Sequence, residues 1–263
     1  MLVFAAITPH PPLLIPTIGK KEALGKIQKT KTAMESLEED LYLAKPNIII
    51  VISPHAHNFS DSFALNVCPE YETDLRQFGD LATKLKFKGE MDMPSQLREM
   101  SLEKKIKTSM ISEPRLDHGA TVPLYYLTKH ITDIALMPIS FTDLDWKTHF
   151  DFGYMLKELI MNTNKRVAVI ASGDLSHALT SDAPAGYSPV GQKFDDTIRE
   201  LLSTNNIAGF LQLEEDFVEQ AAQCGLRSFL ILLGILRDFK YTYKEYSYEG
   251  PFGVGYLTAN FQL

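Results

Sequence analysis

Three of the seven histidines in the sequence closely follow short apolar runs rich in β-branched residues. They are His10 after residues 2–7, His55 after residues 47–52, and His177 after residues 166–171. Such runs are typical of strands covered on both faces, and parallel neighbours would bring their carboxyl ends to one sheet edge, where open α/β folds bind ligands. Imidazoles there can bind a divalent metal or transfer protons near neutral pH. One such histidine is explained more simply as a hydrogen-bonded cap, but three together favour a functional site.

Two further segments place ionisable side chains where they could serve the same site. His118 precedes an apolar stretch that predicts a helix, and it could face the site as an acid or a hydrogen-bond donor. Asp117 or Thr121 could cap that helix. Asp174 lies three residues before His177 and could either orient a histidine or cap the next turn.

The remaining histidines are weaker candidates. His57 lies two residues after His55 and shares its face if the segment is extended, so the pair could chelate a metal. His57 could equally be an exposed loop residue. His130 and His149 lie in helical patterns without special neighbours, and we expect both to be structural or solvated.

Cys224 is a candidate for a third metal ligand. It is followed by Gly225 and a nearly all-apolar helical stretch, so the helix dipole and free N–H groups would stabilise its thiolate. A buried, inert cysteine at a tight turn is the simpler alternative. Glu219, Glu249 or water could take the ligand position instead.

The composition excludes several classes of protein. The chain has 263 residues, of which 45% are hydrophobic and 22% charged, so collagen-like, low-complexity and wholly disordered proteins are ruled out. Only Cys68 and Cys224 carry thiols, which excludes a disulfide framework and makes reduced thiols in the cytoplasm the expectation. A net charge of −7 argues against a nucleic-acid or anionic-membrane binder. The apolar run 229–236 is too short to span a bilayer.

Strand and helix patterns alternate along the chain, which predicts a single α/β domain over residues 1–263. We expect a central, mostly parallel or mixed sheet flanked by helices. The predicted strands are 2–7, 47–52, 134–139, 166–171, 241–248 and 255–261, with a glycine-rich turn between the last two. The predicted helices are 20–43, 146–161, one starting at Ser188-Pro189, and one from about 224 to 238. Residues 68–112 follow no clear pattern, and we expect substrate specificity to depend on them and on the loops.

At the candidate residues the sequence resembles the class III extradiol ring-cleavage dioxygenase B-subunit superfamily, and within it the Memo-like branch. The resemblance covers nearly the whole chain. Each motif is short, and it is their order and spacing together that carry the resemblance. The motifs are Thr8-Pro9-His10-Pro11-Pro12, Ser53-Pro54-His55-Ala56-His57, Leu116-Asp117-His118-Gly119-Ala120-Thr121, Ser172-Gly173-Asp174-Leu175-Ser176-His177 and Cys224-Gly225.

The resemblance implies roles for these residues. His10 and His55 would be the histidine ligands of a divalent metal, which is Fe(II) in the ring-cleaving enzymes. His118 and His177 would be acid/base residues, with His177 taking a phenolic proton, and we place Asp174 with them. The position of the family's glutamate ligand holds Cys224, as in Memo-like members. A thiolate favours copper or zinc more than a carboxylate does.

The function expected from this resemblance is that of a metal-dependent oxidoreductase. Its substrate would be a catechol-like or other small metal-chelating aromatic compound, together with O₂. We expect Fe(II) as the metal, with zinc or copper as alternatives, and a homodimer that needs neither nucleic acid nor membrane. The resemblance also implies a radical S-adenosylmethionine protein and a small AMMECR-type protein as partners on separate polypeptides.

Two other classes of function would use the same residues. A zinc hydrolase would activate water on the same ligands. A Memo-like metal-binding protein without ring-cleavage activity would serve as a scaffold or as a redox partner of the radical protein.

Overall fold

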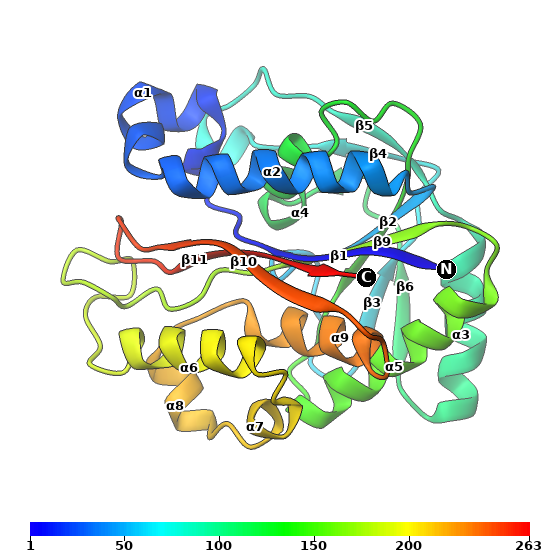
Figure 1. Cartoon of the computed structure of the whole chain (residues 1–263). Coiled ribbons are helices and arrows are strands. Elements are labelled where there is room, and N and C mark those ends of the chain that lie inside the picture. Colours follow the sequence, from blue (N-terminus) through cyan, green and yellow to red (C-terminus); the bar gives the residue numbers. More distant parts are fainter.

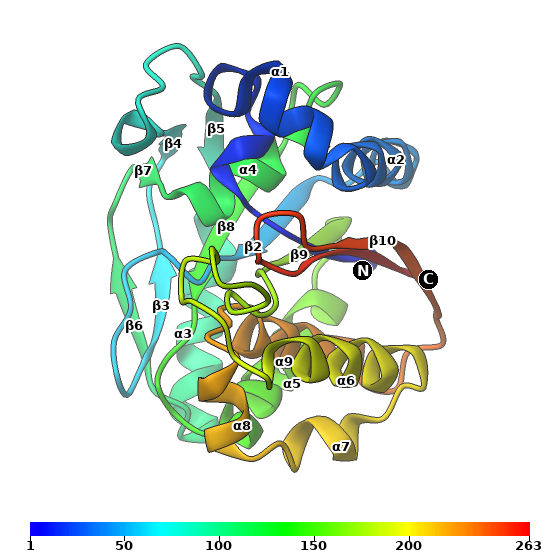
Figure 2. The ribbon, with the colours of Figure 1, turned by 90° about the vertical axis from the view of Figure 1, so that its left-hand side faces the viewer.

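Four parallel strands form the centre of the sheet, as their apolar runs predict (Figures 1 and 2). In spatial order they are β1 (Leu2–Thr8), β9 (Val167–Ser172), β2 (Ile48–Ile52) and β8 (Ala135–Ser140). The computed structural model describes the whole chain, Met1–Leu263. Thr8 pairs with Ser172, and Ile52 pairs with Ala171. The carboxyl ends of β1, β9 and β2 therefore lie side by side at one edge of the sheet.

The outer strands make the 11-stranded sheet mixed. On one side, β11 (Tyr256–Gln262) runs antiparallel to β1 and pairs with the edge strand β10 (Thr242–Glu249), and the glycine-rich turn joins the two as predicted. The other strands lie beyond β8: β5 (Lys86–Gly89), β4 (Glu70–Thr73), β7 (Arg115–Leu116), β3 (Phe63–Asn66) and β6 (Thr108–Ile111). Much of the stretch without a clear sequence pattern is thus built into this half of the sheet.

Helices cover both faces of the sheet (Figures 1 and 2). One layer contains α1 (Pro16–Lys26), α2 (Gln28–Ala44) and α4 (His118–Leu127). The opposite layer contains α3 (Asp92–Lys104), α5 (Trp146–Asn162), α6 (Gly191–Ser203), α7 (Ile207–Leu211), α8 (Glu215–Gln220) and α9 (Leu226–Leu236). This arrangement confirms the predicted α/β class, a mixed sheet flanked by helices.

The central strands are buried on both faces, which explains their unbroken apolar sequences. Along β2, Ile48, Ile50 and Ile52 pack into the core beneath α5 and α9, whereas Ile49 and Val51 pack into the core beneath α2 and α4. Side chains alternate between the two faces of a strand. A strand between two cores therefore has no polar face to expose.

Three helix boundaries differ from the sequence prediction. The helix expected over 20–43 is divided into α1 and α2 at Ile27, whose side chain is fully buried and whose backbone is not helical (φ −113°, ψ 34°). The helix expected from Ser188-Pro189 begins at Gly191, because Ser188 is part of a turn closed by its carbonyl and the Gly191 N–H. The last helix begins at Leu226, two residues after Cys224.

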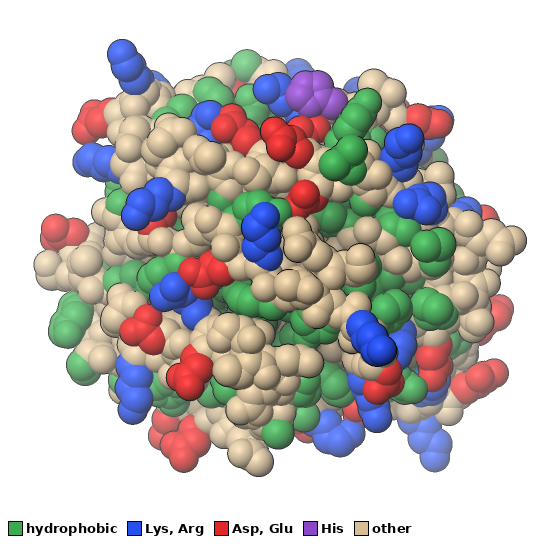
Figure 3. Space-filling view, viewed as in Figure 1, with side chains coloured by type: hydrophobic (Ala, Val, Ile, Leu, Met, Phe, Trp, Pro, Cys, Tyr) green, Lys and Arg blue, Asp and Glu red, His purple; other side chains and the backbone are tan.

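None of the helices combines the length and the hydropathy needed to cross a membrane. On the face shown in Figure 3, acidic and basic side chains are interspersed among polar and apolar ones. The charge of that face is therefore not concentrated over one element.

The close packing of α5 on α9 depends on two glycines. A Cβ atom on Gly153 would lie 2.0 Å from the Ile231 carbonyl oxygen, and one on Gly234 would lie 2.1 Å from the Phe150 carbonyl oxygen. Gly153→Ala is expected to lower the free energy of unfolding by about 1–3 kcal/mol through overpacking, measured by urea denaturation. Gly25→Ala is the matched control, since a Cβ there meets nothing within 4 Å. Equal stability of the two variants would contradict this account of the helix contact.

Candidate metal centre

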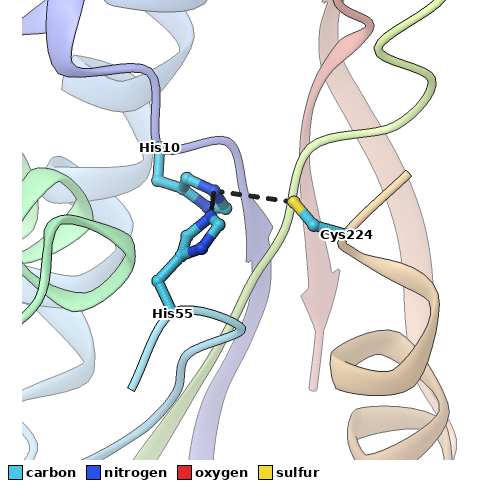
Figure 4. A group of neighbouring side chains, drawn as sticks. All are labelled: His10, His55 and Cys224. Atoms are coloured by element: carbon cyan, nitrogen blue, oxygen red, sulfur yellow. Dashed lines mark hydrogen bonds between the residues drawn. The ribbon is translucent and has the colours of Figure 1, made fainter. Parts of the chain in front are cut away.

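Three predicted ligands meet at the carboxyl edge of the sheet (Figure 4). His10 follows β1, His55 follows β2, and Cys224 lies in the loop before α9. The Nε2 atom of His10 is 3.0 Å from Nε2 of His55 and 3.6 Å from Sγ of Cys224. One potential ligand atom from each residue lies within 4.8 Å of the others. The three side chains point toward one another, so the structure brings the predicted set together.

The imidazole of His10 is held in one orientation by Ser172, the last residue of β9. Ser172 Oγ donates a hydrogen bond to the Gly119 carbonyl (2.5 Å) and lies 2.9 Å from His10 Nδ1. Because its proton is used on Gly119, Ser172 Oγ accepts from His10 Nδ1–H, and we assign the protonated Nδ1 tautomer on this basis. Burial, followed by the neighbouring histidines, holds the pKa of His10 well below its usual value. His10 is therefore neutral, with the Nε2 lone pair directed at His55 and Cys224.

The loop that carries His55 is tied to the start of α4. Ser53 Oγ accepts from the His55 N–H (3.3 Å) and donates to Asp117 Oδ1 (2.5 Å). Asp117 also caps α4 by accepting from the Ala120 N–H (3.2 Å). His118 begins the helix, and its ring stacks on that of His55 with centroids 4.2 Å apart. The predicted cap by Asp117 is therefore confirmed, and His118 lies against His55, where its role as an acid or hydrogen-bond donor stays a prediction.

Asp174 lies between two of the histidines. Its Oδ1 accepts from the backbone N–H of His10 (3.0 Å), and its Oδ2 is 3.8 Å from His10 Nε2 and 4.0 Å from His177 Nε2. Burial raises the pKa of Asp174 to about 7, and nearby Asp195 adds to the rise. Burial likewise lowers the pKa of His177, and it lowers that of His118 to about 4. The Asp174 carboxylate therefore fixes the main chain of His10 by a hydrogen bond and lies near the His10 and His177 rings without hydrogen-bonding to either.

The environment of Cys224 differs from the sequence prediction. Because α9 begins two residues later, the sulfur does not lie in the first turn of the helix. Cys224 Sγ instead accepts from the Asp174 N–H (3.2 Å), and the Asp174 carbonyl accepts from the N–H groups of Cys224 (3.3 Å) and Gly225 (3.0 Å). Burial, followed by the Asp174 charge, raises the pKa of the thiol well above its usual value. The expectation that the helix dipole stabilises a thiolate at Cys224 is therefore wrong, because burial of the sulfur outside the helix has the opposite effect on its pKa.

The other residues considered as a third ligand lie elsewhere. Glu249 Oε1 accepts from both N–H and Oγ1 of Thr30, each at 2.7 Å, and so caps the start of α2. Glu219 lines a separate cavity of about 440 Å³ beside Arg227. Neither glutamate belongs to the group of potential ligands around His10, in which Cys224 is the third member beside His10 and His55.

Two of the weaker histidine candidates have structural contacts. His130 Nδ1 lies 3.0 Å from Glu38 Oε1 on α2, and the His130 side chain is exposed. His149 is fully buried, and its Nδ1 donates to the Asp145 carbonyl (2.8 Å) within the first turn of α5. Neither takes part in the group around His10.

Comparison with known proteins identifies the family. The family model described as the catalytic LigB subunit of aromatic ring-opening dioxygenase matches residues 4–259. The chain belongs to this family. The match spans every residue of the candidate metal centre, so the family-level resemblance predicted from the sequence motifs is confirmed.

Relatives of this LigB-family chain include named dioxygenases. It is 27% identical over 192 residues to a 4,5-DOPA dioxygenase extradiol of Beta vulgaris, covering 70% of this chain and 69% of the relative. It is 23% identical over 255 residues to the 2-aminophenol 1,6-dioxygenase beta subunit of a Pseudomonas species, covering 84% and 80%. A protein of Clostridium acetobutylicum is 33% identical over 259 residues, which is 95% of this chain but only 55% of that protein. The chain thus spans about half the length of this relative.

A solved structure shows the same fold. An uncharacterized protein from Escherichia coli K12 superimposes with a TM-score of 0.69, covering 98% of this chain and 99% of its own, at 17% sequence identity. At that identity the likeness concerns the fold alone.

A cleft of about 960 Å³ opens beside the LigB-type site. His55 and His118 line it, together with His57, Arg76 and Arg115. Phe78 meets the His118 ring edge-on, with centroids 5.0 Å apart. The stretch 68–112, for which the sequence shows no clear pattern, therefore lines part of the cleft beside the site.

Sequence reasoning missed the residue that orients His10. Ser172 is fully buried and bridges His10 Nδ1 to the Gly119 carbonyl. Ser172→Ala removes the acceptor that fixes the His10 tautomer, so we expect metal affinity to fall about 10–100-fold. Titration with zinc against a chromogenic chelator measures the change. An unaltered affinity in a folded Ser172→Ala protein would show that this hydrogen bond does not orient the ligand.

Proposed function

We propose that this LigB-family protein is a metal-dependent oxidoreductase of the extradiol dioxygenase type, with one divalent metal held by His10, His55 and Cys224. The observation that carries the proposal is that one potential ligand atom from each of these three residues lies within 4.8 Å of the others. Neutral imidazole and thiolate are the forms that bind a metal, and the His10 tautomer leaves Nε2 free for it.

The surrounding polar atoms fit a site that takes a metal and a chelating substrate. Nδ1 of His118 and Nδ1 of His177 are both buried without a hydrogen-bond partner, which is costly unless a ligand or water satisfies them. A bound divalent metal would supply open coordination positions for the two oxygens of a catechol-like compound and for O₂. Iron is the metal we expect from the family, with zinc and copper as the alternatives.

Proton transfer falls to the histidines that are not ligands. His177 Nε2 lies beside Asp174 Oδ2, and burial keeps the imidazole neutral at neutral pH, so it can accept a phenolic proton. Asp174 would stabilise the resulting imidazolium. The protonated His177 would later return this proton to the attacked substrate oxygen. His118, which is stacked on His55 and lines the cleft, is the alternative donor if the proton is first passed to it.

A specific observation favours a second candidate function. The third donor is a thiol instead of the carboxylate of ring-cleaving members, and a thiolate shifts preference toward zinc or copper. The second candidate is therefore a Memo-like metal-binding protein without ring-cleavage activity, acting as a scaffold or redox partner. A zinc hydrolase would use the same donors.

Partners and location follow from the proposal and not from the fold. We propose a cytoplasmic homodimer whose small-molecule partners are an aromatic substrate and O₂. If the protein instead has the Memo-like function, its expected partners are a separate radical S-adenosylmethionine protein and an AMMECR-type protein.

Three measurements separate the candidates. Protein loaded anaerobically with Fe(II) and assayed with a panel of catechols is expected to consume O₂. Absence of uptake with every catechol, together with zinc as the metal of gently purified protein and no redox response, would favour the hydrolase. If partner binding survives His10→Ala while metal uptake is lost, the scaffold function is supported.

A further inference from the structure

A buried carboxylate lies behind the loop that carries Asp174 and His177. Asp195, on α6, is fully buried. Its Oδ1 accepts from the Ser176 N–H (2.8 Å), and its Oδ2 accepts from the Tyr248 hydroxyl (2.7 Å). Asp195 is not one of the candidate metal ligands, and it has no role in the proposed proton transfers.

Ser176, the residue that Asp195 contacts, has all its polar groups engaged. Its hydroxyl donates to the Ala221 carbonyl (2.8 Å) and accepts from the Ala178 N–H (3.0 Å). Its carbonyl accepts from the Gly255 N–H (2.8 Å). Ser176 is therefore fixed by four hydrogen bonds, and it directly precedes His177 in the chain.

The same loop is bonded to the one that carries Cys224. The Ala221 carbonyl that Ser176 Oγ contacts also accepts from the His177 N–H (3.1 Å). At the other end, Asp174 and Cys224 exchange backbone and sulfur hydrogen bonds. Residues 174–178 and 221–225 thus form one bonded unit, and Asp195 joins that unit to α6 and β10.

The packing leaves Asp195 little freedom to move. A Cβ on Gly255 would lie 2.0 Å from Asp195 Oδ2, and a Cβ on Gly191 would lie 2.7 Å from Ser176 Oγ. Burial is also unfavourable for the carboxylate, as the rise of the Asp195 pKa to about 7 indicates. The nearby Arg199 forms its ion pair with Glu245. The unfavourable burial of the Asp195 carboxylate is best explained by the geometry that its hydrogen bonds impose on neighbouring residues.

We propose that Asp195 is a positioning residue: through Ser176 it holds His177 and, through the Ala221 and Asp174 hydrogen bonds, the Cys224 loop in the geometry of the site. Tyr248 keeps the carboxylate directed at Ser176. The inference rests on the proposed function for the roles of His177 and Cys224, but the contacts themselves are independent of it.

The primary test observes His177 in the metal-free protein, so it does not require metal binding or activity. Histidine-ring NMR spectra of wild type, Asp195→Ala, Asp195→Asn and Tyr248→Phe are compared, with His177→Ala identifying the resonance. Asp195→Ala is expected to shift and broaden the His177 signal, and Tyr248→Phe to shift it less. Asp195→Asn keeps an acceptor for Ser176 N–H and is expected to restore most of the wild-type position. The exposed His130 signal should stay unchanged throughout.

Glu90→Ala is the matched control. Glu90 is a buried carboxylate that accepts from the Asp92 (3.0 Å) and Met93 (3.2 Å) N–H groups and pairs with Lys165 at the start of α3. The Glu90→Ala substitution should lower the free energy of unfolding without shifting the His177 signal. An unchanged His177 signal in Asp195→Ala would overturn the proposal. If that variant does not fold, an unchanged signal in Tyr248→Phe would do so.

A second arm uses cobalt as the probe of the Cys224 loop. Cobalt-loaded wild type is expected to show a thiolate-to-cobalt charge-transfer band, and Asp195→Ala to bind cobalt about 10–100-fold more weakly. Absence of the band in wild type would count against the proposed metal site and leave the NMR result to decide the role of Asp195. A wild-type band with equal affinity in Asp195→Ala would contradict positioning of the Cys224 loop.

Discussion

His10→Ala protein is expected to lose its divalent metal, with an affinity reduced by more than about 100-fold. His10 is the central member of the group, since its Nε2 atom lies 3.0 Å from His55 Nε2 and 3.6 Å from Cys224 Sγ. Loss of a residue that merely orients a ligand costs about 10–100-fold in affinity, so loss of the ligand itself should cost more. Competition with a chelator, followed for zinc and for Fe(II), measures the change.

The control for this variant is His130→Ala. His130 is exposed and pairs with Glu38 on α2, outside the group around His10. The His130→Ala protein should bind metal as the wild type does. This result would show that the loss in His10→Ala is specific to the proposed site and not a general effect of removing a histidine. Circular dichroism checks that the His10→Ala protein is folded, because His10 is buried. Equal metal affinity in His10→Ala and wild type would exclude the proposed centre.

His177→Ala is expected to lower kcat for ring cleavage by about 10²–10⁴ while leaving metal content unchanged. The reason is that a positioned general base contributes about this much to a proton-transfer step. His177 Nε2 lies 4.0 Å from Asp174 Oδ2, and its Nδ1 is buried without a partner. The measurement is O₂ consumption at saturating catechol, together with metal analysis of the same sample.

His57→Ala is the control for His177→Ala. His57 lines the cleft but is not among the three potential metal ligands, so its replacement is expected to alter KM more than kcat. If His177→Ala retained the wild-type kcat, the assignment of His177 as the base would be wrong, although the metal site would be unaffected. Parallel loss of metal would mean that His177 acts on the centre through structure alone.

The sequence predicts best those features that depend on residues close together in the chain, such as buried strands and helix caps. Continuous β-branched runs predict doubly covered strands, and their order allows the ends of β1, β9 and β2 to meet. The convergence of His10, His55 and His177 near one edge follows from that arrangement alone. The cap formed by Asp117 could also be predicted, because a cap depends on residues only three positions apart.

Features that depend on distant contacts could not be predicted. The tautomer of His10 depends on Ser172, 162 residues away, and the raised pKa of the Cys224 thiol depends on burial against the Asp174 loop. The first long helix is divided at Ile27, where the backbone is not helical and the side chain is fully buried, although the apolar pattern continues across this point. Asp195 gave no signal, since an acidic residue on an amphipathic helix is ordinarily exposed.

The central claim is that His10, His55 and Cys224 hold one divalent metal. X-ray absorption of the zinc-loaded protein tests it most directly, with Cys224→Ser and Cys68→Ser as a matched pair. The account predicts one sulfur at about 2.3 Å and nitrogen donors at about 2.0–2.1 Å from zinc in wild type and in Cys68→Ser, and loss of the sulfur in Cys224→Ser. A first shell of nitrogen and oxygen alone in the wild type, or a sulfur that persists in Cys224→Ser, would contradict it.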